Sequence, residues 1–168
     1  PIDFNDIDVS NLDSFCNDIG TGIFDNTKFK YIDITYWDVS NIESMRNMFE
    51  NCKELESIGD ISNWDVSNVT DMSQMFFGCK YFNQDISKWD VSNVTDMSHM
   101  FYCCWSFNQD LSSWDVSSVT RMSRMFSGCH SFNKDISNWN VSNVMNWMYR
   151  TNMFDGCPIK DEYKPKFK

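Results

Sequence analysis

Residues 64–88 read WDVSNVTDMSQMFFGCKYFNQDISK, and residues 89–113 read WDVSNVTDMSHMFYCCWSFNQDLSS. These two segments are the central copies of an internal repeat. Tryptophan, a Met-Phe pair and cysteine recur in three separate columns with one shared period, so the repeat does not depend on a single residue type. A period of roughly 20 to 50 residues is typical of proteins built from stacked coils. We therefore expect one domain whose coils bury a common core.

The three columns are predicted to form the structural core. Successive tryptophans are separated by 27, 25, 25 and 25 residues. The first gap holds two extra residues after Cys52, which a loop can absorb, and the last unit holds three extra residues after Val144. Three residues are nearly one helical turn, so we expect the apolar face to stay in register there. The members of the columns are Trp37, Trp64, Trp89, Trp114 and Trp139; Phe49, Phe76, Phe101, Phe126 and Phe154; and Cys52, Cys79, Cys104, Cys129 and Cys157.

The spacing within each unit predicts one short strand and one short helix. In residues 89–91, Trp-Asp-Val alternates inward, outward, inward, as a parallel strand does. Val94, Met97, Phe101 and Cys104 then fall at i, i+3, i+7 and i+10, the spacing of an amphipathic helix of two to three turns. The expected fold is an α/β, right-handed, leucine-rich-repeat-like solenoid with coils of about 25 residues, because each unit must bury its apolar face against a neighbour.

The repeat also divides the chain. Residues 1–33 are expected to be an N-terminal cap that includes a degenerate first repeat, since Asp-Val-Ser-Asn-Leu at 8–12 lacks the tryptophan. Residues 34–158 hold about five coils, and residues 159–168 form a basic C-terminal tail or cap.

The repeated motif resembles a known family of repeats. Residues 64–72, WDVSNVTDM, followed by MFFGC at 75–79 and FNQDIS at 82–87, are similar to the BspA-like leucine-rich repeat class. They look most like the repeat of about 25 or 26 residues in mycoplasma-type lipoproteins and Listeria-type surface proteins. This resemblance implies a scaffold on a microbial surface that is used for adhesion or protein binding, and it implies no catalytic residues.

The aspartate of each Trp-Asp-Val segment is the first candidate for binding. Stacking would align these carboxylates at roughly 4.8 Å, where like charges repel, so a cation, a basic partner or Ser and Thr hydroxyls should offset them. Lys88 is expected to neutralise part of the row, and a second aspartate row before each strand, Asp33 to Asp135, favours turns. Calcium across the two rows is an alternative, although its usual Gly-rich motif is absent. The partner-binding candidates are Asp38, Asp65, Asp90, Asp115 and Lys88.

Composition argues against a nucleic-acid partner and against a membrane-spanning helix. The chain has 24 acidic and 14 basic residues and a net charge of −10, which disfavours nucleic acid. No apolar run approaches the roughly 18 residues of a membrane-spanning helix.

Two weak signals for chemistry remain. His99 and Cys103 are four residues apart on the predicted helix, as two zinc ligands would be, but four converging ligands cannot be assembled. Cys129 beside His130 suggests a nucleophile and base, but the cysteine column is expected to consist of buried thiols. We therefore predict no metal, no resident cofactor and no catalytic site.

The sequence leads to one preferred function and one alternative. The preferred function is a non-catalytic protein-interaction module, at the cell surface of a microbe or secreted, which binds a protein partner through the outward face of its strands. The alternative is a structural or assembly protein of a phage or virus, with the solenoid as a spacer, which would place the chain in a virion or the cytoplasm. Oligomeric state is not predicted by the repeat.

Overall fold

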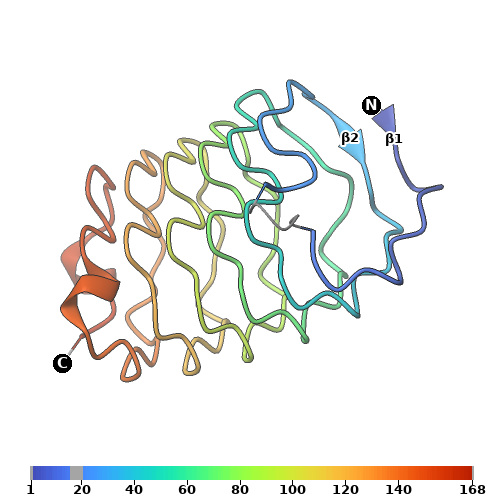
Figure 1. Cartoon of the computed structure of the whole chain (residues 1–168). Coiled ribbons are helices and arrows are strands. Elements are labelled where there is room, and N and C mark those ends of the chain that lie inside the picture. Colours follow the sequence, from blue (N-terminus) through green and yellow to red (C-terminus); the bar gives the residue numbers. More distant parts are fainter. Residues whose placement is uncertain (1, 16–20, 168) are drawn as a thin grey trace.

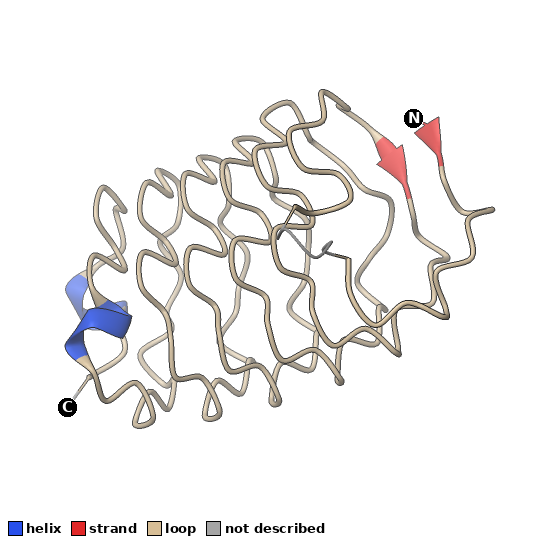
Figure 2. Ribbon diagram, in the orientation of Figure 1, coloured by secondary structure: helices blue, strands red, loops and turns tan. Residues whose placement is uncertain are grey.

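The computed structural model describes residues 2–15 and 21–167. The described chain winds into a row of stacked coils, with its N-terminal and C-terminal segments at opposite ends of the row (Figure 1). Strands β1 (Ile2–Asp3) and β2 (Ile32–Asp33) pair in parallel at the N-terminal end, and the short 3₁₀ helices η1 (Trp147–Arg150) and η2 (Asp161–Tyr163) lie at the C-terminal end. Turns and loops form nearly all of the described chain between them (Figure 2).

Backbone hydrogen bonds join the coils along one side. The amides of Met72, Gln74 and Phe76 donate to carbonyls one coil later, at 3.0, 2.9 and 3.0 Å. This alternation is that of a parallel strand pair. Single parallel bridges join Ser44 to Asp71, Asp71 to Asp96, and Asp96 to Arg121. We call the surface formed by residues 43–47, 70–74, 95–99, 120–124 and 148–152 the ladder face.

The predicted helix in each coil is wrong. In the segment that should be helical, His99 and Cys103 have φ of 59° and 57°, in the left-handed region that no α-helix allows. Residues 97–104 form successive turns instead, in which Met100 donates to Met97 and Cys104 donates to Phe101. Turns and helices both return to the same side every three to four residues, so the apolar spacing fits either one. The part of the chain that the structure describes contains no α-helix.

The predicted strand is also misplaced. The parallel bridges fall on Asp71, Asp96 and Arg121, several residues after the Trp-Asp-Val segments. Around Trp89 the coils are joined by side chains: its indole N–H donates to the Ile61 carbonyl at 2.9 Å. Asn93 donates to the Ser67 carbonyl at 2.8 Å. The parallel bridges therefore lie on the ladder face, and on the tryptophan side the coils are joined by side-chain hydrogen bonds.

The repeated columns lie in the core. All five tryptophans of the column are buried, and Phe49, Phe76, Phe101 and Phe126 have no exposed surface. Neighbouring rings of these four phenylalanines stack at 5.5 to 6.0 Å, a geometry that adds to the hydrophobic gain of burial. In the last coil Phe154 and Cys157 are only half-buried.

The cysteine column has a role beyond apolar packing. The Cys104 thiol donates to the Phe76 carbonyl at 2.9 Å, and the Cys129 thiol donates to the Phe101 carbonyl at 2.8 Å. Each thiol thus ties its coil to the preceding one. Burial raises the pKa of both thiols well above the usual value, so both stay protonated and can donate. The cysteines that the structure describes are free, and Cys16 lies outside the described residues.

The C-terminal residues close the end of the stack. The Ile136 amide donates to the Tyr163 carbonyl at 3.0 Å, and Ile159 is buried. Residues 159–167 therefore pack on the last coil as a cap. Across the described residues, no helix combines the length and the apolar character needed to cross a bilayer.

Candidate functional site

The aspartates of the Trp-Asp-Val row are engaged in local turns. Oδ1 of Asp65 accepts from the backbone amide of Ser67 at 3.1 Å and from its hydroxyl at 2.6 Å, and Asp38 and Asp90 repeat this arrangement with Ser40 and Ser92. These hydrogen bonds lower the pKa of Asp65, and they outweigh the opposing effect of Asp38. The serines thus offset the repulsion along the row, which was one of the expected solutions.

Asp115 and the aspartates of the second row also accept hydrogen bonds from residues two positions later. Asp115 accepts from the Ser117 amide at 3.0 Å. Each carboxylate of the second row accepts from the residue two positions later, as Asp85 does from Ser87 at 2.9 Å. Lys88 acts on this second row, where its charge helps to lower the pKa of Asp85 after the hydrogen bonds of Ser87.

The two aspartate rows are also the candidate calcium site. Among residues 2–15 and 21–167, no group of three or more His, Cys, Asp or Glu side chains is placed to hold a metal ion. The first oxygen of each carboxylate accepts from the serine two residues later, or in the case of Asp33 from Thr35, so both rows act as turn formers.

The two weak signals for chemistry are not brought together. His99 and Cys103 do not share a helix face, because both adopt positive φ in a chain of turns. The Cys129 thiol points to the Phe101 carbonyl, whereas His130 is exposed and stacks on Trp105 at 5.5 Å between ring centroids. Neither pair has the geometry of a metal site or of a nucleophile and its base.

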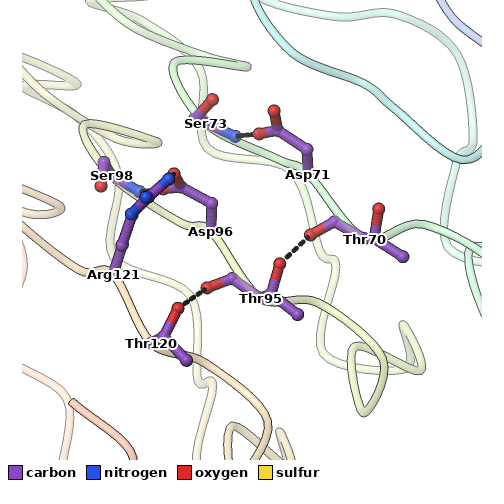
Figure 3. A network of polar contacts seen from close by, with 8 residues as sticks. All are labelled: Thr70, Asp71, Ser73, Thr95, Asp96, Ser98, Thr120 and Arg121. Carbon is purple, nitrogen blue, oxygen red and sulfur yellow. Dashed lines mark hydrogen bonds and ion pairs between the residues drawn. The ribbon is translucent and has the colours of Figure 1, made fainter. Parts of the chain in front are cut away.

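The ladder face carries a more organised polar surface. Thr120 donates through its hydroxyl to the Thr95 carbonyl, and Thr95 donates in the same way to the Thr70 carbonyl, both at 3.2 Å (Figure 3). Beside this row, the Ser73 and Ser98 amides donate to the carboxylates of the aspartates two residues before them, each at 2.8 Å. Serine and threonine side chains are therefore held at regular intervals across the coils.

A groove runs beside these rows. Two adjoining hollows of about 320 and 290 Å³ share His99 and Ser123. The first extends back to Arg46, and the second extends to Arg124 and Trp147. The groove thus crosses several coils and ends at η1.

The charges in the groove are unevenly balanced. Arg121 lies 3.3 Å from a carboxylate oxygen of Asp96 and packs over the Tyr149 ring at 5.2 Å (Figure 3 shows the ion pair). Arg46 and Arg124 are exposed and form no ion pair with a carboxylate of the described chain. His99 is half-buried, and burial followed by the charge of Arg124 lowers its pKa, so its imidazole is neutral near pH 7.

The insertion in the last unit forms the apolar end of the groove. The register of the coils is kept, since Met122 donates to the Tyr149 carbonyl at 2.7 Å and Phe126 donates to the Met153 carbonyl at 2.9 Å. The extra residues bulge outward into η1, however, and do not add to a buried helix face. Met145 is 83% exposed and Trp147 is 66% exposed.

Sequence reasoning missed this surface, although two signals were present. The four arginines of the chain are Arg46, Arg121, Arg124 and Arg150, and all of them fall in the same part of the repeat. The insertion itself brings Met, Trp, Met and Tyr into a stretch where the repeat elsewhere places polar residues. Both signals were hidden because the segment was interpreted as a helix with one buried face.

Comparison with known proteins places the chain in a family. A family model described as Mycoplasma protein of unknown function, DUF285, matches residues 17–117 and 90–159. The chain belongs to this family. The description of the DUF285 family names no activity, and no curated protein matches the chain.

One solved structure is distantly similar to this DUF285 protein. It is a leucine-rich repeat protein from Bacteroides ovatus, with 18% sequence identity and a TM-score of 0.34. The similarity covers 67% of this chain and 33% of that one, so the chain spans about a third of that protein's length.

Proposed function

We propose that the chain is a non-catalytic protein-interaction module of the BspA-like leucine-rich repeat class, displayed on a microbial surface or secreted. The family match to Mycoplasma proteins supports the microbial origin of the fold. The repeat supports the role of a scaffold, because stacked coils present an extended surface that is suited to a partner.

The observation that carries the proposal is the exposed apolar cluster of the insertion. Met145, Trp147 and Met148 are 83%, 66% and 55% exposed, and Tyr149 lies next to them at the end of the groove. Large apolar side chains gathered beside a polar rim are typical of binding surfaces, and tryptophan, tyrosine and arginine are the residues that dominate their energetics. The buried core does not need these side chains, so their exposure calls for a partner.

Capture from a host-cell surface extract tests this function. One bait is the native chain, and a second carries Trp147→Ala and Met148→Ala, which remove exposed side chains only. A third carries Asp65→Asn, Asp90→Asn and Asp115→Asn and tests the basic partner predicted from the acidic row. Circular dichroism and thermal unfolding establish that all three baits fold alike.

We expect a protein that the native chain and the Asn variant retain and that the Trp147 variant loses. Equal retention by all three baits would contradict the role of the insertion. If only the Asn variant fails to retain the protein, the aspartate row is the binding surface. If the chain retains nothing and light scattering shows a multiple of its mass, the assembly-protein alternative is favoured, since the N-terminal end exposes strand β1.

A further inference from the structure

The arginines of the chain are concentrated on one surface. The ten lysines are spread from residue 28 to residue 168, whereas the arginines occur only in the segments of the ladder face. Arg46, Arg121 and Arg124 line the groove, and Arg150 packs over the Phe167 ring in the C-terminal cap. Arginine differs from lysine in that its planar fork binds a carboxylate through two parallel hydrogen bonds.

Two of these arginines are available to a ligand. Arg121 is already paired with Asp96 and Tyr149. Arg46 and Arg124 have no such carboxylate partner in the described residues, although Arg46 opposes the rise in pKa that burial and Asp25 impose on Glu50. In a chain of net charge −10, exposed guanidinium groups without a bound carboxylate are complementary to an acidic partner.

The stacking of the coils sets the distance between the backbone positions of the two arginines. Residues 44, 71, 96 and 121 are joined by successive parallel bridges, so Arg46 and Arg124 lie on coils three steps apart. Each step is about 4.8 Å, which places them roughly 14 Å apart along the stack. An extended chain advances about 3.3 Å per residue, so four residues cover this distance, and residues i and i+4 of a strand face the same side.

The floor of the groove between the two arginines suits a peptide backbone. Gln74, Ser98 and His99 line it, and each has a side chain that can form hydrogen bonds. Beyond Arg124 the groove ends at Trp147, whose exposed ring offers an apolar contact.

We propose that the groove binds an extended acidic peptide segment that lies along the stack, with two carboxylates four residues apart on Arg46 and Arg124 and an apolar residue beyond them on Trp147. This inference rests on the proposed function and names the partner chemistry of the same surface. A nucleic acid is charged at every phosphate and would meet Asp71 and Asp96 on the same face, which disfavours it. A peptide can carry uncharged residues opposite these two carboxylates.

Fluorescence anisotropy with a labelled peptide tests the proposal on the full chain. The probe has nine residues, with Glu at its second and sixth positions, Leu at its eighth, and Ser or Gly elsewhere. It is used in both sequence orders, because the spacing does not define the direction of the peptide. Three comparison peptides are used. The first carries Gln in place of both Glu residues, and the second has a shortened spacing, with Glu at its second and fourth positions. The third carries phosphoserine in place of both Glu residues.

We expect the Glu probe, in its tighter order, to bind at least tenfold more tightly than the Gln and shortened-spacing peptides. R46Q and R124Q should each weaken its binding about tenfold, as expected for the loss of one bidentate pair. K53Q is the matched control, since it removes one exposed positive charge that does not line the groove and should leave the affinity unchanged. All three substitutions are at exposed positions, and thermal unfolding checks that each variant remains folded.

Equal affinity for the Glu and Gln peptides would overturn the proposal, as would an equal effect of K53Q and R46Q. Tighter binding of the phosphoserine peptide would replace the carboxylate partner by a phosphorylated one. If the Glu probe fails while the Trp147 variant still loses its surface partner, the interaction function stands and this partner chemistry is wrong. If the probe binds as expected and no surface partner is captured, the site stands and the proposed location of its partner is wrong.

Discussion

The central coils and the last coil differ in how completely they bury their large apolar side chains. In residues 64–129 every large apolar residue of the columns is buried, and each coil repeats the hydrogen bonds of its neighbour. In the last unit three extra residues push Trp147 and its neighbours into solvent, and Phe154 is only half-buried. The regular coils therefore supply stability, whereas the irregular coil carries apolar surface that stability does not require. In repeat proteins, insertions into single repeats map to loops on one face of the stack, and that face is often the binding face.

The largest expected difference between the two regions is the effect of truncating an aromatic ring. Phe101→Ala removes a fully buried ring that stacks between Phe76 and Phe126, and should lower the free energy of unfolding by about 3–5 kcal/mol. Trp147→Ala removes a larger ring that is exposed to solvent, and it should change the free energy of unfolding by no more than about 0.5 kcal/mol. Urea unfolding of both variants measures the contrast. A comparable loss in the two would show that the insertion is part of the core, and would remove the basis of the proposed function.

A smaller difference is expected within the tryptophan column. The Trp89 indole donates to the Ile61 carbonyl, whereas Nε1 of Trp64 is buried with no hydrogen-bond partner in the described structure. The missing bond falls in the one coil that has two extra residues before its tryptophan. Because phenylalanine lacks the N–H group, Trp89→Phe should cost about 1–2 kcal/mol more than Trp64→Phe.

The two substitutions remove the same atoms, so each is the control for the other. Their difference in free energy of unfolding isolates the hydrogen bond. Equal losses would mean that the indole N–H contributes nothing to the joining of the coils.

The smallest expected difference is in acid. Hydrogen bonds from Ser117 hold the pKa of Asp115 below its ordinary value of 3.8, whereas the equivalent position in the last coil is Asn140, which accepts from Ser142 at 3.2 Å. A carboxylate whose folded pKa is lowered stabilises the fold fully above the unfolded value, and this stabilisation is lost as the pH falls through the folded value. Asp115→Asn keeps an acceptor oxygen that does not titrate. The variant should therefore lose less free energy of unfolding than the native chain between about pH 5 and about pH 2.

Chemical denaturation at several pH values compares the two proteins. Identical acid dependence would show that the serine hydrogen bonds do not distinguish the folded carboxylate from the unfolded one. A greater loss in the variant would reverse the sign of the argument.

Much of the core could be predicted from the sequence, because burial follows directly from the repeat. Residues that recur with one period must occupy equivalent places in stacked coils, and only apolar columns can be buried repeatedly without partners. The same logic placed Trp89, Phe101 and Cys104 inside before any backbone conformation was known. The loop position of the extra residues after Cys52 also follows from the period alone.

The backbone conformation could not be predicted in the same way. Apolar residues spaced three and four apart fit a helix, but they fit a succession of turns with left-handed residues equally well. Glycine at 78 and 128 and asparagine at 47 and 51, all with positive φ, were the available signals for turns. They were outweighed because the inter-coil hydrogen bonds that stabilise these turns lie some 25 residues away in the sequence.

By itself the sequence determined that this chain is a stack of coils, which side chains fill its core, and that each coil must bury its apolar face against a neighbour. Only the tertiary structure decided which polar and aromatic side chains line a common groove. The aspartate row is the more visible pattern in the sequence, yet its oxygens are turned to their own serines, a contact between residues two apart. The groove joins Arg46, His99, Arg124 and Trp147 from four different coils, and that proximity exists only once the coils are stacked.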